Sequence, residues 1–284
     1  MKEIRRIIDF HTHIFPDKIA CKAIPILEAC GHIKANTNGT VEGLIESMDK
    51  ANITYSVALP VATSSLQVES INNFAISVNN SYKENHIISF GAMHPMYENY
   101  KKELKRLKDN GILGIKLHPE YQGTYIDSDS YIKIIDEAFK IGLIVIIHAG
   151  IDIGIDSDIK ASPSRILNCK SKLKNDGVFV LAHMGSWNMW DIVYDKLLGK
   201  GFYIDTAFSL GNLDYNDKHI KMFDKDSFKR FIDKQGIDNI LFATDSPWAS
   251  QEEYVKLVNN LGLDEEALDK ICYSNACKLL KIEV

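Results

Sequence analysis

Residues 142–150 read GLIVIIHAG, and segments of this kind decide the fold of the chain. A glycine comes first, the apolar run Leu143–Ile147 follows, and His148 stands where the run ends. Continuous apolar runs of this length are typical of strands that are buried on both faces of a parallel sheet. A glycine just past a helix end adopts the left-handed conformation at little cost, so Gly142 marks the passage from a helix into a strand.

Eight such apolar runs recur along the chain. They are Ile7–Phe10, Tyr55–Leu59, Ile87–Ala92, Ile112–Leu117, Leu143–Ile147, Val178–Ala182, Phe202–Asp205 and Asn239–Ala243. Segments with helical spacing of apolar residues lie between or after them: Val41–Ala51, Ser130–Lys140, Pro163–Lys174, Asp226–Lys234, Gln251–Leu261 and Asp264–Leu280. Eight strands that alternate with helices predict an α/β protein with a (β/α)₈ TIM barrel, formed as a single domain over residues 1–284.

A doubly wound open sheet is the alternative architecture. Such a sheet normally carries a glycine-rich phosphate loop after its first strand. Here the first strand is followed by His11-Thr12-His13 instead, so we favour the barrel.

Composition excludes several classes of protein. The 284 residues carry a net charge of −5 with no long basic run, so nucleic-acid binding is not expected. No stretch approaches the roughly 20 apolar residues of a membrane span, and the N-terminus does not read as a signal peptide. Five scattered cysteines are typical of reduced thiols. We therefore expect a cytoplasmic protein with a small-molecule substrate, and leave a homodimer open.

Polar residues gather at the ends of the predicted strands, where barrel enzymes carry their chemistry. Six of the nine histidines close strands: His11, His13, His94, His118, His148 and His183. Residues i and i+2 of a strand point to the same side, so His11 and His13 can bind one ion. Imidazole nitrogen suits zinc and other borderline divalent metals.

These strand ends carry a family resemblance that covers essentially the whole chain. The matching stretches are DFHTHIFP at 9–16, GIKLHPEYQG at 114–123, IIHAG at 146–150, LAHMGS at 181–186 and LFATDSPW at 241–248. The chain resembles the amidohydrolase superfamily, and more closely its branch of TIM-barrel hydrolases and decarboxylases related to aminocarboxymuconate-semialdehyde decarboxylase.

The resemblance implies one divalent metal ion, with zinc as the first choice and manganese or iron as alternatives. It assigns the metal-ligand roles to His11, His13, His148 and Asp245. It places His183 beside the metal, either as a ligand or as a catalytic group that does not bind the ion, and this choice stays open. Asp245 could instead cap the following helix, but Ser246 and Ser250 are available for that role.

Four further residues are predicted to bind substrate: Lys116, His118, Tyr121 and Trp248. Some superfamily members carry a carboxylated lysine that bridges two metals on the strand of Lys116. Because the branch in question works with one metal, we expect an unmodified lysine that binds an anion or a carboxylate. His118 precedes a proline and could simply hold a loop, whereas Trp248 follows Asp245 by three residues.

The sequence favours a metal-dependent hydrolase of a small amide, ester or lactone. Asp245 would accept the proton of the attacking water and return it to the leaving group, and His183 or the metal would stabilise the oxyanion. The alternative is a metal-dependent decarboxylase of an aromatic or muconate-like acid. It ranks second because arginine is nearly absent from the strand ends, although Lys116 could hold a carboxylate. A non-catalytic metal- or ligand-binding barrel ranks third.

Overall fold

The computed structural model describes residues 6–155, 157–215 and 218–282. It divides into two compact units, each of which is described by itself. The terminal unit comprises Met1–Ala58 and Asp205–Val284, and the central unit comprises Leu59–Ile204.

All eight predicted strands are present. They are β1 (Ile8–Thr12), β2 (Tyr55–Ala58), β3 (Ile87–Ser89) with its continuation β4 (Gly91–Ala92), β5 (Gly114–Leu117), β6 (Ile144–Ile147), β7 (Phe179–Leu181), β8 (Tyr203–Asp205) and β11 (Ile240–Leu241). At least one helix follows each of them before the next of these predicted strands or the chain end, so the predicted alternation of strand and helix is confirmed.

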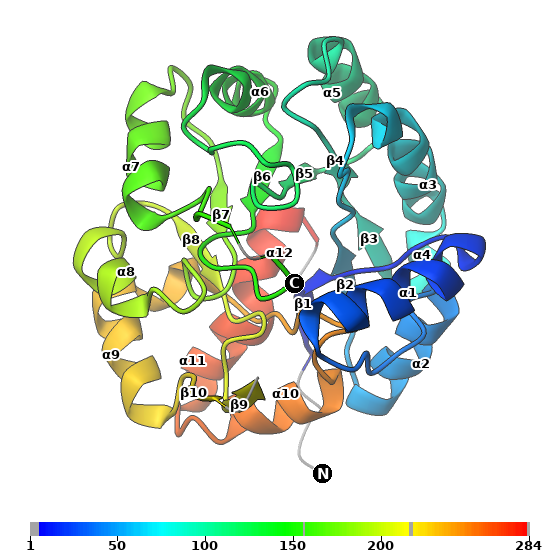
Figure 1. Ribbon diagram of the computed structural model, residues 1–284. Coiled ribbons are helices and arrows are strands. Elements are labelled where there is room, and N and C mark those ends of the chain that lie inside the picture. The colour runs from blue at the N-terminus through cyan, green and yellow to red at the C-terminus, as the bar shows by residue number, and fades with distance from the viewer. Residues whose placement is uncertain (1–5, 156, 216–217, 283–284) are drawn as a thin grey trace. The chain divides into compact units, whose positions relative to one another are not determined.

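In the central unit, β4, β5, β6, β7 and β8 pair in sequence order, and every pairing is parallel. All four residues of β6 are buried, as its continuous apolar run predicts. Helices α5 (Tyr100–Asp109), α6 (Asp129–Lys140) and α7 (Pro163–Lys172) lie outside the strands (Figure 1). Helix α6 buries residues at helical spacing: Tyr131, Ile134, Ile135, Ala138 and Phe139. The remaining helices of this unit are α3 (Val68–Asn80), α4 (Tyr82–Asn85) and α8 (Trp190–Lys196).

Glycines before the central strands serve two different purposes. Gly142 has φ 71°, as expected for a left-handed residue at a helix end. Gly177 does not adopt positive φ; instead, a Cβ there would lie 2.3 Å from Cδ1 of Phe139. Gly177 is therefore a point of close approach between the strand start and α6.

The terminal unit brings its own strand ends together. Strand β1 pairs with β2 in parallel. On the other side of β1, the Phe10 N–H donates to the Phe242 carbonyl oxygen at 2.9 Å, and the Asp245 N–H donates to the His11 carbonyl oxygen at 2.8 Å. The C-terminal ends of β1 and β11 consequently lie side by side. Two polar segments that are remote in sequence are thereby brought next to each other.

Helices of the terminal unit are α1 (Asp17–Gly31), α2 (Val41–Ala51), α9 (Lys225–Gln235), α10 (Gln251–Asn259), α11 (Glu265–Asp269) and α12 (Asn275–Leu280). The predicted helix Asp264–Leu280 is interrupted by a π-helical turn, Lys270–Ser274. An antiparallel hairpin of β9 (Asn212–Tyr215) and β10 (Lys218–Lys221) was not predicted, because its strands are short and polar. No helix of the described part of the chain is both long and apolar enough to cross a membrane.

Candidate functional site

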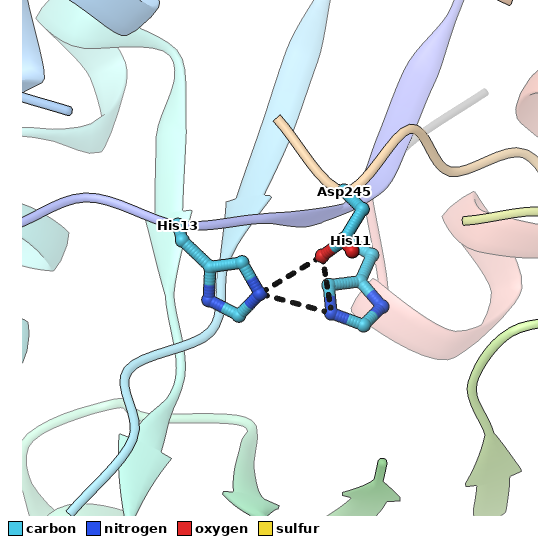
Figure 2. Close-up of side chains that lie close together, drawn as sticks. All are labelled: His11, His13 and Asp245. Carbon is cyan, nitrogen blue, oxygen red and sulfur yellow. Dashed lines mark hydrogen bonds and ion pairs between the residues drawn. The ribbon is translucent and has the colours of Figure 1, made fainter. Parts of the chain in front are cut away.

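Three side chains converge at the strand ends of the terminal unit (Figure 2). His11 is the penultimate residue of β1, His13 follows the strand directly, and Asp245 lies beyond β11. The Nε2 atoms of His11 and His13 are 3.2 Å apart. Asp245 Oδ1 lies 3.0 Å from His13 Nε2 and 3.3 Å from His11 Nε2. One donor atom from each residue thus faces the other two.

This spacing fits a divalent ion. Donors held about 2.1 Å from a metal lie roughly 3.0 Å apart at right angles and roughly 3.4 Å apart in a tetrahedron. The three measured separations, 3.0, 3.2 and 3.3 Å, fall in this range. Two imidazoles and a carboxylate are also donors that zinc, manganese and iron accept. The residues present therefore suit the metal that the sequence implies.

His11 is oriented by a carboxylate behind it. Its Nδ1 lies 2.9 Å from Oδ2 of Asp205, which is fully buried at the end of β8. Asp205 Oδ1 accepts the Ala207 N–H at 3.1 Å, so the carboxylate itself is held in place. A carboxylate on one imidazole nitrogen fixes the ring and leaves the other nitrogen to donate its lone pair to a metal. From the sequence alone, Asp205 could be either a partner that supports a metal ligand or a plain structural acceptor.

Asp9 joins the two segments that carry the cluster. Its Oδ1 accepts the backbone N–H groups of His11 and Thr244, and its Oδ2 accepts the Thr244 hydroxyl at 2.6 Å and the Gln251 amide at 2.7 Å. Burial raises the pKa of Asp9 to about 6 despite these bonds. Sequence analysis did not assign Asp9, although a carboxylate inside an apolar strand two residues before His11 was a usable signal.

Asp245 does not cap the next helix. Helix α10 is capped by Ser250, whose hydroxyl accepts the Glu253 N–H at 3.3 Å. Asp245 has φ 72°, a left-handed conformation that is uncommon for residues with a side chain and is frequent at functional sites. Its carbonyl oxygen accepts the N–H of Trp248 at 2.8 Å, so Trp248 closes a tight turn after it.

A second group of side chains occupies the strand ends of the central unit. His183 Nε2 lies 3.0 Å from His148 Nδ1. The His118 ring stacks on the His148 ring with centroids 4.3 Å apart and an interplanar angle of 15°. Asp152 Oδ2 lies 3.4 Å from His118 Nε2 and 3.9 Å from His148 Nε2. His118, His148 and Asp152 are thus close enough together to be considered as a second metal-binding group.

His148 is kept neutral. Burial lowers its pKa well below the usual range, and electrostatic interactions with His118, His183 and Lys116 lower it further. Its Nε2 is buried and has no hydrogen-bond partner among the described residues. A neutral imidazole whose Nδ1 bonds to a neighbour and whose Nε2 is unpartnered is suited to bind a metal.

The predicted substrate residues divide between the two units. Lys116, His118 and Tyr121 belong to the central unit, with the Tyr121 ring centroid 4.3 Å from that of His118. Trp248 belongs to the terminal unit, beside Asp245. His148 and His183 lie in the central unit, so the predicted fourth metal ligand and the role of His183 stay predictions.

Asp152 was missed by sequence analysis. It lies in the long stretch Gly150–Ser162 between β6 and α7, where loops often form a wall of the substrate site. Its position four residues after His148 was the available signal.

Comparison with known proteins identifies the family and the fold class of the chain. The sequence profile of the amidohydrolase family matches residues 8–282. No curated protein matches the chain.

Solved structures of similar fold cover almost the full length of both chains. A 2,6-dihydroxybenzoate decarboxylase from Rhizobium is 16% identical, with a TM-score of 0.68 and coverage of 98% of this chain and 99% of the other. An uncharacterised TIM-barrel protein from Bordetella bronchiseptica is 17% identical, with a TM-score of 0.70 and coverage of 97% and 98%.

A dihydroxybenzoic acid decarboxylase from a Polaromonas species was solved with manganese and the inhibitor 2-nitroresorcinol. It is 16% identical, with a TM-score of 0.67 and coverage of 98% of both chains. These likenesses confirm the TIM-barrel fold class. Together with the profile match over residues 8–282, they show that the chain belongs to the amidohydrolase family.

Proposed function

We propose that the chain is a metal-dependent, non-oxidative decarboxylase of a hydroxylated aromatic or muconate-like acid. This reverses the order that the sequence favoured, in which hydrolysis came first. The observation that carries the change is a buried cation beside the histidines of the central unit. Structural relatives named as dihydroxybenzoate decarboxylases support the same class.

Lys116 supplies that cation. It lies on β5, is 1% exposed, and is close enough to His148 to lower the pKa of the imidazole. An ammonium group in the protein interior attracts a carboxylate more strongly than one in water does, because the local dielectric constant is lower. Lys116 is therefore suited to bind the carboxylate of an acid substrate, which removes the main objection to decarboxylation.

The metal would be held by His11, His13 and Asp245, with His148 as the fourth ligand. When bound, a divalent ion supplies Lewis-acid stabilisation of negative charge on the substrate oxygens. His183, 3.0 Å from His148 Nδ1, would orient the His148 ring and keep its Nε2 lone pair available.

Decarboxylation breaks the bond between the ring carbon and the carboxylate carbon. The electron pair stays on the ring carbon, carbon dioxide leaves, and the carbon takes up one proton. Asp245 would pass this proton from solvent to the ring carbon: its carboxylate would take up one solvent proton and release it to the carbon that lost the carboxylate. The Lys116 ammonium group would orient the carboxylate before it departs.

The test is product analysis with the manganese-loaded enzyme. We expect carbon dioxide from 2,6-dihydroxybenzoate or another acid in a panel of hydroxybenzoates and muconates. In heavy water, the product should carry one deuterium at the carbon that lost the carboxylate. 2-Nitroresorcinol should inhibit this reaction. Cleavage of esters, lactones or amides in ¹⁸O-labelled water, with label in the released acid and no carbon dioxide, would contradict the proposal.

Hydrolysis is the second candidate. It is favoured by the position of Asp245 next to two imidazoles, the arrangement in which a carboxylate takes the proton of a nucleophilic water. Under this alternative, Lys116→Met should leave turnover of a neutral ester unchanged, whereas under the decarboxylase proposal the same variant loses most of its carbon dioxide release.

A further inference from the structure

We propose that Asp152 and His118 form a pair that recognises a hydroxyl group on the substrate. The inference rests on the proposed function, because it assumes that the acid binds near His148. According to this inference, two side chains of the central unit determine which substituted acids the enzyme binds. Sequence analysis did not identify Asp152 and gave His118 only a general role in substrate binding.

The two side chains lie close enough together for one oxygen atom, placed to one side of the line that joins them, to contact both. Asp152 Oδ2 lies 3.4 Å from His118 Nε2, longer than the 2.7–3.2 Å of a good N–H···O hydrogen bond. An oxygen atom about 2.8 Å from each would bridge them with normal hydrogen-bond lengths. Asp152 Oδ2 is also 3.9 Å from His148 Nε2, so a group bound to the pair would lie against the proposed fourth metal ligand.

Neighbouring hydrogen bonds define what the pair can recognise. The Tyr121 N–H donates to His118 Nδ1 at 3.3 Å, so Nδ1 is an acceptor and the neutral ring carries its proton on Nε2. His118 therefore presents a donor, and the Asp152 carboxylate presents an acceptor. A hydroxyl group both donates and accepts, and so it satisfies both residues. A methoxy group only accepts, and a hydrogen atom satisfies neither.

The same tautomer argues against a second metal at this place. A histidine that carries its proton on Nε2 has no lone pair there to give to an ion. Of the two imidazoles in the group, His148 is the one whose Nε2 is without a hydrogen-bond partner in the described structure. His118 and Asp152 are therefore better suited to bind substrate than to bind metal.

Asp152 is held firmly enough to discriminate between substituents. Its Oδ1 accepts the Gly154 N–H at 2.8 Å, which leaves Oδ2 as the oxygen facing His118. The far end of its loop is anchored by Glu120, whose Oε1 accepts the N–H groups of Lys160 and Ala161, both at 3.0 Å. The Gly150 N–H donates to the Ala161 carbonyl oxygen at 3.1 Å and closes the base of the loop.

The test is a binding cycle with three probes on the manganese-loaded enzyme. The probes are 2-nitroresorcinol, 2-nitrophenol, which lacks one hydroxyl, and 3-methoxy-2-nitrophenol, in which that hydroxyl is methylated. We expect the wild-type enzyme to bind 2-nitroresorcinol about 10- to 100-fold more tightly than either of the others, the range for a hydrogen bond to a charged group.

Asp152→Asn should remove part of this preference. The asparagine can still accept the Gly154 N–H through its carbonyl oxygen, so its NH₂ group would face the substrate as a donor. The variant should lose the preference for hydroxyl over methoxy, because both groups can accept from this NH₂ and from the His118 Nε2–H, and it should still bind both of these probes more tightly than 2-nitrophenol. His118→Phe, which keeps a ring stacked on His148, should reduce the preference for hydroxyl over hydrogen, because only the Asp152 carboxylate then contacts the hydroxyl. Asp158→Asn removes a charge from the same loop and should retain the wild-type preference.

Several results would overturn the inference. These are equal binding of the three probes by the wild-type enzyme, no binding of any probe, equal discrimination in Asp152→Asn and wild type, or loss of discrimination in Asp158→Asn. Two metal ions per chain, falling to one in Asp152→Asn, would show a metal site instead.

The inference and the proposed function can fail separately, because the probes report binding and do not report turnover. Discrimination without carbon dioxide release would refute the decarboxylase alone, and carbon dioxide release without discrimination would refute the pair alone.

Discussion

The two groups of polar side chains differ in how their members are arranged. In the terminal unit, single donor atoms of His11, His13 and Asp245 face one another at 3.0–3.3 Å. In the central unit, the histidines are linked to each other through a ring stack and an Nδ1–Nε2 contact, and Asp152 stands 3.4 Å or more from the two nearest of them. In the first arrangement, the donor atoms all face one point. In the second, each side chain contacts its neighbours in turn, and the polar atoms do not face one point.

The residues that surround the two groups also differ. His11 is backed by the carboxylate of Asp205, which strengthens it as a ligand. His148 is buried, and burial, together with electrostatic interactions with two histidines and Lys116, lowers its pKa and keeps it neutral. One group therefore attracts a cation, and the other suits an anionic substrate with hydroxyl groups. The predictions below test this division, beginning with the largest effect.

Asp245→Asn should reduce turnover by about 10²–10⁴-fold, the usual cost of losing a proton-transfer group. The asparagine keeps one oxygen for the metal, so the metal content should fall less than the activity. Parallel measurement of kcat and of bound metal checks this. Full activity in a variant that retains its metal would show that Asp245 moves no proton.

Loss of His13 and loss of His118 should affect the metal content differently. His13→Ala should weaken metal binding by more than the roughly 10–100-fold that is typical of losing an outer partner of a ligand. His118→Phe is the matched control and should bind metal like the wild-type enzyme. Metal titration followed by elemental analysis distinguishes them, and an equal loss in both variants would contradict the division.

Removing an orienting partner should have an intermediate effect. Asp205→Asn should weaken metal binding by about 10–100-fold, because His11 loses the carboxylate that fixes its ring. His183→Ala should reduce kcat with a smaller loss of metal if His183 only orients His148. Absence of metal from the His183→Ala variant would instead indicate that His183 is a metal ligand.

A smaller effect is expected on stability. Burial raises the pKa of Glu120 from its ordinary 4.5 to about 7. A folded state that holds its proton more tightly than the unfolded state loses stability as pH rises between these values, by roughly 3 kcal/mol in total. Glu120→Gln should remove this dependence and should be more stable than the wild-type protein at pH 8. Denaturant unfolding at pH 5 and pH 8 measures it, and parallel pH profiles for the two proteins would contradict the assignment.

The sequence predicted those features that follow from local periodicity. Apolar runs such as Leu143–Ile147 and the glycines before them identified the strands, and the i, i+2 spacing identified His11 and His13. The break in the Asp264–Leu280 helix was not predictable, because no proline or glycine marks the π-helical turn.

Partners that lie far apart in sequence were the hardest to find. Asp9 bonds Gln251 across 242 residues, and Asp205 contacts His11 across 194. Asp152 is close in sequence to His148, but nothing in a long loop indicates which carboxylate turns inward. The predicted fourth ligand, His148, came from family resemblance and was not derivable from spacing.

The central claim is that one divalent ion is held by His11, His13 and Asp245. A crystal structure of the manganese-soaked protein, with anomalous data at the manganese edge, tests it directly. The account predicts a single anomalous peak, with donor atoms of these three residues and of His148 within about 2.0–2.3 Å of it. A peak between His118 and Asp152 alone, or two peaks bridged by a carboxylated Lys116, would contradict it.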